Sequence, residues 1–464
     1  MTEPLWTSDE IALATGGTPS AAFAVTGVAF DSREVTPGDL FIAMKGEATD
    51  GHRFVGKAFD QGAAGAIVSE AVDRPHVAVT DSAKALDALG RASRARMQGK
   101  VVGVTGSVGK TGTKEALFLS LDRANPGTVH RSVKSYNNHV GVPLSLARMP
   151  RESSHGLFEM GMNHAGELAA LTRLVRPHVA IVTAIAPAHI EFFGSETAIA
   201  QAKAEIFEGL EPGGTAIIPY DSPHVATLYG KAERHAARIL TFGFGDGADV
   251  RATEAVPAAS GGTLVTARLP EAELCFTVAA PGEHWVSNAL AVLACVEALG
   301  GDLAAAGLAL AEMPGLAGRG ERRMVQVAGG QALLIDESYN ANPLSMAATL
   351  KQLGREDAAR RIAVLGGMRE LGGQSADLHA GLAVPLRAGN IDYAILVGDE
   401  MAPLADALDG AIAYDHVPDA ATATQRLRDS MRAGDAILVK GSNGIGLSRL
   451  VAALNARARD GEDG

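Results

Sequence analysis

Residues 101–117, VVGVTGSVGKTGTKEAL, contain the residue types that hold phosphate groups. A glycine-rich turn followed by a lysine and a hydroxyl residue ends the general pattern G-x-x-x-x-G-K-[ST]. Gly109, Lys110 and Thr111 supply that ending, whereas Val104 stands where the first glycine is expected. This departure from the motif leaves two questions: whether the segment binds a nucleotide, and which reaction that nucleotide would drive.

The segments around the turn favour a phosphate site. VVGVT is rich in β-formers and TKEALFLSL has helical periodicity, so we expect a strand, a turn and a helix. Such a turn points backbone N–H groups at one place, and the helix start adds partial positive charge. Lys110 would neutralise the β- and γ-phosphates, and the Thr111 hydroxyl would ligate Mg²⁺. The expected loop comprises Thr105, Gly106, Ser107, Val108, Gly109, Lys110, Thr111 and Gly112.

Val104 then belongs to the strand, and Gly106 and Gly109 provide the close approach to phosphate. No guanine-reading N-K-x-D motif occurs, which disfavours a GTPase. The loop alone does not say what the nucleotide is used for.

Three isolated polar residues follow buried or helical runs after the loop. Glu159 follows GLF and could hold Mg²⁺ opposite the nucleotide, His189 lies in IAPAHIEFFGS, and Lys203 lies in AIAQAKAEIFEGL. Taken singly, each has an ordinary explanation: a carboxylate at a sheet rim, a structural histidine and a solvated lysine.

The pattern of strand-like and helix-like runs divides the chain into three α/β units, which must position these residues. Residues 1–98 alternate short strand-like and helix-like runs. From residue 99, apolar runs such as HVAIVTAIAP alternate with helices, which predicts a mainly parallel sheet. TLVTARL and LCFTVAA, within 249–280, predict antiparallel strands before the long helix HWVSNALAVLACVEALG. Near residue 318 a new series of apolar, strand-like runs begins, as expected for a doubly wound domain. The runs are ALLIDES, RIAVLGG, YAILVG and AILVKG.

Composition narrows the function classes. The 464-residue chain is long enough for several domains, with 47% hydrophobic and 20% charged residues, as in a soluble globular protein. Its net charge of −12 disfavours nucleic acid or an anionic membrane as the main partner. Cys275 and Cys295 form no C-x-x-C pair, and we find neither a secretory signal nor an apolar run of membrane-spanning length. We expect a cytoplasmic protein.

Several motifs together resemble the ATP-dependent Mur ligases: TGSVGKT, SYNNHVGVPLSL, FEMGMNHAGEL, AHIEFFGSETAIAQAKAEI and GEHWVSNALA. ESYNANPLSMAATL, VLGGMRELG and FDSREVTPGDLFIAMKGEATDGHRFVGKAFDQGA resemble the branch that adds D-alanyl-D-alanine to UDP-N-acetylmuramoyl-tripeptide. The resemblance covers about residues 26–452. It implies a small α/β UDP-substrate domain (1–98), a central P-loop ATP-binding domain with a mainly parallel sheet (99–317) and a C-terminal Rossmann-like ligase domain (318–464).

The resemblance also implies a catalytic and metal-binding set. Lys110 and Thr111 correspond to family residues at the ATP phosphates, and Glu159 to the ligand of the Mg²⁺ that bridges them. His189 corresponds to a histidine near a second Mg²⁺. Lys203 corresponds to a lysine that carries a carbamate in relatives; an ammonium cannot bind a cation, but a carbamate can. Catalysis is thus expected from Lys110, His189 and Lys203, and metal ligation from Thr111, Glu159, His189 and Lys203.

Further residues match family positions around the nucleotide and the substrate. Asn288 corresponds to the asparagine that contacts adenine, and Arg319 to a hinge arginine facing the phosphates. Asp336 or Glu337 would contact the ribose, and the sequence leaves both open. The expected substrate residues are Ser32, Arg33, Asn137 and Asn138.

The implied reaction is ATP-driven amide formation through an acyl phosphate, in peptidoglycan synthesis and so in cell-wall biogenesis, cell shape and division. The implied cofactors are ATP and two Mg²⁺ ions. The implied partners are small molecules, with no nucleic acid, no membrane insertion and a monomeric chain. A ligase adding diaminopimelate or lysine is disfavoured by SYNANP and the lack of DNPR, and folylpolyglutamate synthesis by DSREVTPGDLF. A non-enzymatic nucleotide switch would not need Glu159, His189 and Lys203 together.

Overall fold

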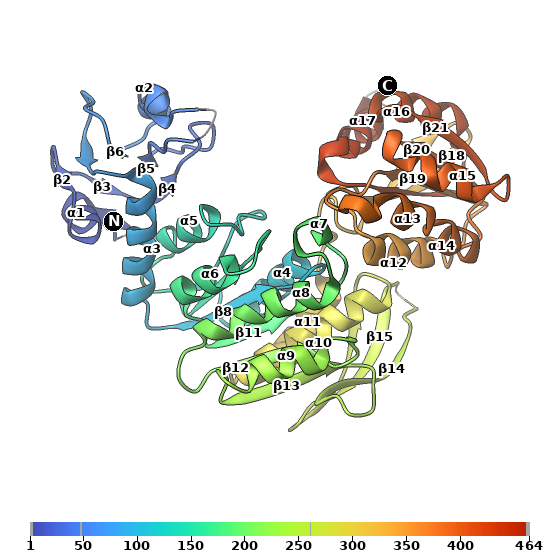
Figure 1. The fold of residues 1–464 in the computed structure, drawn as a ribbon, viewed down its shortest axis with the longest axis horizontal. Coiled ribbons are helices and arrows are strands. Elements are labelled where there is room, and N and C mark those ends of the chain that lie inside the picture. The colour runs from blue at the N-terminus through green and yellow to red at the C-terminus, as the bar shows by residue number, and fades with distance from the viewer. Residues whose placement is uncertain (1–2, 47–48, 260, 461–464) are drawn as a thin grey trace.

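The structure is a computed structural model that describes residues 3–46, 49–259 and 261–460. Figure 1 shows an N-terminal part (blue) and a C-terminal part (orange to red) at opposite ends of a central part (cyan to yellow). Each part has its own sheet, with five, nine and six strands in chain order, and a further two-stranded pair lies in the N-terminal part. The chain is therefore a three-part α/β protein with mainly parallel sheets, as the sequence predicts.

The N-terminal sheet has the order β2-β7-β6-β5-β4, and only the β2–β7 pair is antiparallel. Helix α3 is the last element of this part. It packs against α1 and, in the central part, against α5 (Figure 1). The elements are β1 (Trp6–Thr7), α1 (Ser8–Thr15), β2 (Thr18–Pro19), β3 (Ala24–Val25), β4 (Gly27–Ala29), β5 (Asp39–Ile42), η1 (Gly51–Phe54), α2 (Val55–Asp60), β6 (Gly65–Val68), β7 (His76–Ala78) and α3 (Ser82–Arg96).

The central sheet has the order β16-β15-β14-β13-β12-β11-β8-β10-β9. Strands β9 to β14 pair in parallel, and the two expected strands, β15 and β16, extend the sheet as an antiparallel ribbon. Its strands are β8 (Lys100–Thr105), β9 (Val129–Arg131), β10 (His155–Glu159), β11 (Val179–Val182), β12 (Thr215–Pro219), β13 (Arg238–Gly243), β14 (Val250–Pro257), β15 (Thr263–Arg268) and β16 (Glu273–Val278).

The helices of the central part include the expected long helix, α10, whose apolar run is almost wholly buried against the sheet. Because β11 and β12 lie inside the sheet with both faces covered, their residues are buried throughout, which explains their unbroken apolar sequences. The helices are α4 (Lys110–Ala124), α5 (Gly141–Ala147), α6 (Glu167–Val175), α7 (Ile190–Phe193), α8 (Glu196–Ala204), η2 (Glu205–Gly209), α9 (Val225–Ala232), α10 (Glu283–Ala298) and α11 (Leu303–Glu312).

The C-terminal sheet has the order β17-β18-β22-β19-β20-β21 and is parallel except for β17. The four apolar runs form β18 (Gly330–Glu337), β19 (Arg360–Gly366), β20 (Tyr393–Val397) and β22 (Asp435–Lys440). The edge strands β17 (Glu321–Val327) and β21 (Ala413–Val417) lie outside those runs, because edge strands carry exposed polar residues.

Helices cover both faces of this sheet (Figure 1), with α12, α13 and α14 on the side toward the central part and α16 and α17 on the other. They are α12 (Pro343–Leu353), η3 (Gly372–Gln374), α13 (Ser375–Ala380), α14 (Ala383–Ala388), η4 (Asp399–Met401), α15 (Ala402–Leu408), α16 (Ala420–Ser430), η5 (Asn443–Ile445) and α17 (Leu447–Asp460). None of the helices in the described ranges is both long and apolar enough to cross a membrane.

Candidate active site

The glycine-rich turn joins β8 to α4, so residues 101–117 form the expected strand, turn and helix. Val104 is a fully buried residue of β8 and pairs with neighbours in β10 and β11. Gly106 and Gly109 have φ values of +151° and +84°, a backbone region that favours glycine. The two glycines thus shape the turn, and the missing glycine at 104 falls inside a strand.

Gly106 also lies against the end of β11. A Cβ atom on Gly106 would meet Thr183 Oγ1 at 1.9 Å. That hydroxyl donates to the Thr105 carbonyl at 3.2 Å and to the carbonyl of Val108. The Ser107 hydroxyl donates to the Ala186 carbonyl at 3.0 Å. The turn is therefore held in place by the segment that follows β11.

Lys110, the first residue of α4, turns its ammonium back over the turn and donates to the Gly106 carbonyl at 2.7 Å. Burial lowers the pKa of Lys110, nearby Glu159 partly offsets that effect, and Arg319 lowers the pKa further. Arg319 also stacks its guanidinium 4.1 Å from the ring centre of Tyr339. Two cations thus lie near each other at the turn, which favours an anionic ligand between them.

Glu159, at the end of β10, is a buried carboxylate with 1% of its surface exposed. The Thr111 hydroxyl donates to its Oε2 at 2.8 Å, and the Asn137 amide donates to its Oε1 at 2.7 Å. Both donors are uncharged. Because a buried charge is normally paired with an opposite charge or a metal, these oxygens suit a divalent cation.

Lys203, on α8, is also 1% exposed and contradicts the simple expectation of a solvated lysine. Burial, reinforced by repulsion from Lys110, lowers its pKa well below the usual value. No acidic side chain of the described residues offsets these effects. Helical periodicity alone did not reveal this burial, because a lysine among apolar positions is usually at their solvated edge.

His189 precedes α7 and has a left-handed backbone, with φ of +61°. Its Nδ1 contacts the carboxylate of Glu370, which lies in the C-terminal part. The hydrogen bond between His189 and Glu370 lowers the pKa of Glu370. Sequence reasoning missed Glu370 as a site residue, although it lies within the quoted stretch VLGGMRELG. Only the tertiary structure brings that stretch to His189.

A cavity of about 600 Å³ lies between the central and C-terminal parts and gathers most of the expected residues. From the central part, the lining includes loop residues, a carboxylate and an amide that could bind a ligand, a half-buried histidine and a buried lysine. The expected residues that line it are Ser107, Val108, Gly109, Lys110, Gly112, Asn137, Glu159, His189, Lys203, Asn288, Arg319 and Glu337. Thr111 is not part of the lining, but its hydroxyl donates a hydrogen bond to Glu159, which is. Among the expected loop residues, Thr105 and Gly106 support the turn without lining the cavity.

The two acidic residues at the end of β18 face different ways. Asp336 is buried and accepts hydrogen bonds from the backbone amides of Gly318 and Ser338, both at 3.0 Å. Glu337 lines the cavity, 3.3 Å from the ammonium of Lys440 on the neighbouring strand β22. In this arrangement the carboxylate available to a ligand is that of Glu337.

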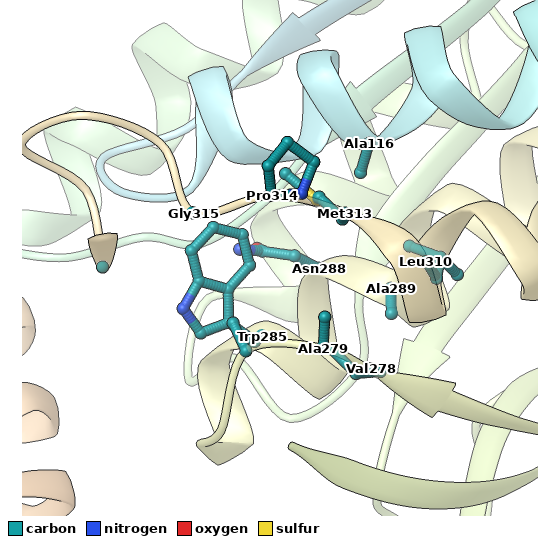
Figure 2. A pocket seen from close by; sticks show the side chains of 12 residues that line it. Ala116, Val278, Ala279, Trp285, Asn288, Ala289, Leu310, Met313, Pro314 and Gly315 are labelled. Atoms are coloured by element: carbon teal, nitrogen blue, oxygen red, sulfur yellow. The ribbon is translucent and has the colours of Figure 1, made fainter. Parts of the chain in front are cut away.

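Asn288 lies at the mouth of a small, mostly apolar pocket beside the loop. Figure 2 shows Asn288 next to the Trp285 ring on α10, with Met313 and Pro314 close by. A Cβ atom on Gly109 would meet the Asn288 amide oxygen at 2.6 Å, so the amide touches the turn itself. The walls of this pocket are mostly apolar, and its volume is only about 20 Å³.

The remaining expected residues lie away from the cavity. Ser32 is buried in the N-terminal part, and Arg33 forms an exposed 2.6 Å ion pair with Asp31. The Asn138 side chain accepts from the backbone amides of Val140 and Gly141 at 3.2 and 2.9 Å, before α5. The structure thus gives Asn138 a local structural bond and separates Ser32 and Arg33 from the nucleotide loop.

Comparison with known proteins yields three matching family descriptions: "Mur ligase family, catalytic domain" over residues 24–98, "Mur ligase middle domain" over 104–296 and "Mur ligase, glutamate ligase domain" over 322–443. The UDP-N-acetylmuramoyl-tripeptide–D-alanyl-D-alanine ligase of Escherichia coli is 34% identical, across 95% of this chain and 96% of its own.

Solved structures agree. A crystal structure of MurF from Acinetobacter baumannii has a TM-score of 0.84 and 32% identity, covering 97% of this chain and 99% of that one. MurF from Thermotoga maritima in complex with ADP has a TM-score of 0.78 and 26% identity, covering 94% and 98% of the two chains.

Proposed function

The chain belongs to the Mur ligase family, and we propose that the cavity between its central and C-terminal parts is where ATP activates a peptide carboxylate. The protein is an ATP-dependent ligase that joins D-alanyl-D-alanine to UDP-N-acetylmuramoyl-tripeptide in peptidoglycan synthesis. The observation that carries the proposal for the site is the meeting of Lys110, Glu159, His189 and Lys203 around one cavity.

Positioning and charge neutralisation are the main tasks in phosphoryl transfer. The backbone of residues 106–109 and the start of α4 hold the phosphates, since their N–H groups and the helix dipole favour anions. Lys110 and Arg319 approach the same phosphates from opposite parts of the chain. Their combined charge stabilises the negative charge that spreads over the transferred group.

Mg²⁺ fits the acid at the end of β10. Thr111 and Glu159 would hold it, and it would supply charge neutralisation between the β- and γ-phosphates. Asn137 keeps the Glu159 carboxylate oriented through its 2.7 Å hydrogen bond. The fit rests on a buried carboxylate whose partners are both neutral.

A second cation site is proposed at His189 and Lys203. A lysine with a depressed pKa is partly a neutral amine, and a neutral amine adds to CO₂ to give a carbamate and a proton. The resulting anion would relieve the repulsion between Lys203 and Lys110 and offer oxygen ligands for Mg²⁺. Glu370 would hold the His189 ring from the other side.

The adenine of ATP is assigned to the part of the large cavity lined by Trp285 and Asn288 (Figure 2), with its polar edge at Asn288. The ribose is assigned to Glu337, because Asp336 already bonds two backbone amides. Lys440 restrains the Glu337 carboxylate from β22.

The reaction then proceeds in two transfers. The tripeptide's terminal carboxylate oxygen attacks the γ-phosphorus, the bond to the β-phosphate oxygen breaks, and an acyl phosphate and ADP result. The amine of D-alanyl-D-alanine next attacks the acyl carbon, phosphate leaves, and the amine loses a proton as the amide forms. Lys110 and Arg319 hold the phosphoryl group through both transfers, which replaces random encounter with fixed geometry.

We place the acceptor along a path from the N-terminal part to the cavity. Ser32 and Arg33 are assigned to its uridine diphosphate end, whereas Asn137 lies near its peptide end. The incoming dipeptide is assigned to the C-terminal lining, where Asn340, Asn342 and Lys440 face the cavity. Since the substrate contacts come from all three parts, 1–98, 99–317 and 318–464 are proposed as units that close together on their ligands.

We further propose that the chain works as a monomer, because one chain supplies every residue of this site, and in the cytoplasm, where its nucleotide substrates are made. Sedimentation of the ligand-free and ATP-bound protein tests the first point.

ADP release tests the proposed function directly. With ATP, Mg²⁺, UDP-N-acetylmuramoyl-tripeptide and D-alanyl-D-alanine, we expect ADP in step with pentapeptide nucleotide, and only slow release when either substrate is omitted. ADP formed at the same rate without both substrates would instead identify a nucleotide switch. Amide formation with free diaminopimelate or lysine would identify a different ligation step.

A further inference from the structure

Residues 132–137, between β9 and α5, contact elements from every part of the chain and are named here the bridging segment. Glu34 approaches it from the N-terminal part, Lys114 from helix α4 and Arg319 from the connection to the C-terminal part. A single six-residue stretch thus lies between the proposed substrate site and the proposed nucleotide site.

Glu34 makes two contacts with this segment. Its carboxylate contacts the Lys134 ammonium and accepts a 2.8 Å hydrogen bond from the Tyr136 hydroxyl. Hydrogen bonding to Lys134 is the main cause that lowers the pKa of Glu34. Glu34 directly follows Arg33, so it lies within the stretch assigned to the uridine diphosphate.

Lys114 anchors the same segment to the phosphate-loop helix. Its side chain is fully buried, and its ammonium donates to the carbonyls of Ser132 at 2.7 Å and Lys134 at 3.0 Å. Lys134 has φ of +52°, a conformation that is unfavourable for a residue with a side chain and must be held by its surroundings. Lys114 and Glu34 hold it from two sides.

The far end of the bridging segment reaches the reacting groups. Asn137 donates to Glu159, and the Ser132 hydroxyl accepts from the Glu159 backbone amide at 3.2 Å. The Ser135 hydroxyl accepts a 3.2 Å hydrogen bond from Arg319. A shift of this segment therefore moves the partners of the acid and of the arginine that face the phosphates.

We propose that Glu34 is a positioning residue that couples occupancy of the N-terminal substrate site to the geometry of the ATP site through Lys134 and Tyr136. The inference rests on the proposed function for its assignment of the two sites. When the nucleotide end of the acceptor orders the stretch around Arg33, Glu34 fixes Lys134 and Tyr136, and Asn137 and Ser135 follow.

This role is one of geometry and not of stability. Lys134 is 65% exposed in the pair, and exposed ion pairs contribute little to folding stability. Loss of the pair therefore leaves the fold nearly as stable but frees the bridging segment. Binding at each site should still occur, while the effect of one ligand on the other is lost.

The test measures the affinity of a non-hydrolysable ATP analogue with Mg²⁺, by calorimetry, with and without saturating UDP-N-acetylmuramoyl-tripeptide. In the wild type we expect the tripeptide nucleotide to tighten analogue binding by roughly tenfold, within the usual range of coupling between sites. In Glu34→Gln and Lys134→Met we expect that ratio to fall toward one, with analogue affinity in the absence of the tripeptide nucleotide unchanged. Ligation by these variants should show a lower kcat, and Lys134→Arg, which keeps the charge, should retain the ratio.

Arg151→Gln is the matched control, because Arg151 makes another ion pair between the same two parts, with Glu10. It should keep the wild-type ratio. A wild-type ratio of one, a normal ratio in Glu34→Gln, or an equal loss in Arg151→Gln would each overturn the coupling role. Failure of the proposed function is seen separately, as a wild-type protein that makes no ADP with its substrates.

Discussion

The Thr111 hydroxyl donates a 2.8 Å hydrogen bond to the Glu159 carboxylate, which joins the start of α4 to the end of β10 at one buried acid. The two residues lie 48 positions apart in the sequence. They meet because β8 and β10 are parallel neighbours whose carboxyl ends share an edge of the sheet. The glycine-rich turn and this buried acid therefore lie side by side at one edge of the sheet.

Replacing Lys110 by alanine should lower ligation by at least about 1,000-fold, because Arg319 alone does not replace its charge at the phosphates. Circular dichroism and the melting temperature should stay close to those of the wild type. Lys100→Ala, at the exposed start of the same strand–turn–helix unit, is the control and should retain activity. A Lys110→Ala protein that forms product at near the wild-type rate would refute the assigned role.

Glu159→Gln should reduce ligation by roughly 100-fold or more and raise the Mg²⁺ concentration needed for half-maximal rate. The ligand-free variant should be as stable as the wild type or more so, by up to about 2 kcal/mol, because a buried charge whose hydrogen-bond partners are both neutral is removed. Urea unfolding and Mg²⁺ titration measure the two effects. Glu152→Gln, on an exposed turn, should change neither.

Lys203→Ala should be nearly inactive and should regain activity with added short carboxylic acids, which replace the carbamate oxygens in the vacated space. A ¹³C carbamate signal from labelled bicarbonate should be present in the wild type and absent from the variant. Lys231→Ala, whose lysine pairs with Glu208 at the surface of α9, should retain both activity and signal. Full activity of Lys203→Ala would exclude the carbamate.

Acid should destabilise the fold through His130 on β9. Burial lowers the pKa of His130 to about 4, below the ordinary histidine value of 6.5. The folded state therefore binds fewer protons than the unfolded state between these values, so the contribution to stability is complete above pH 6.5 and is lost as pH falls toward 4. The loss should reach roughly 1–3 kcal/mol at pH 4. Urea unfolding of His130→Gln should show a smaller change between pH 7 and pH 5; an equal change would place the effect elsewhere.

Much of the fold could be predicted because buried parallel strands have unbroken apolar sequences. That pattern indicated β11 and the inner strands of the C-terminal sheet. The edge strands β17 and β21 contain several charged or polar residues and no long apolar run, so they did not stand out. Turn chemistry located the phosphate loop, since its glycines and lysine are local requirements.

The site could be predicted only in part, because burial and long-range pairing depend on tertiary structure. Nothing local distinguishes the buried Lys203 from a solvated helix lysine. Nor does spacing show that Glu370 contacts His189, or that Glu34 reaches Tyr136 across 102 positions. Spacing likewise does not show that Asp336 bonds two backbone amides while Glu337 lines the cavity.

The close approach of Gly106 to Thr183 has a consequence for inhibition of this protein. Any side chain at position 106 would collide with a buried, hydrogen-bonded threonine and would also need an unfavourable backbone conformation. The position is therefore closed to substitution. A compound that takes its contacts from the backbone amides of this turn would leave the protein few substitutions that weaken its binding.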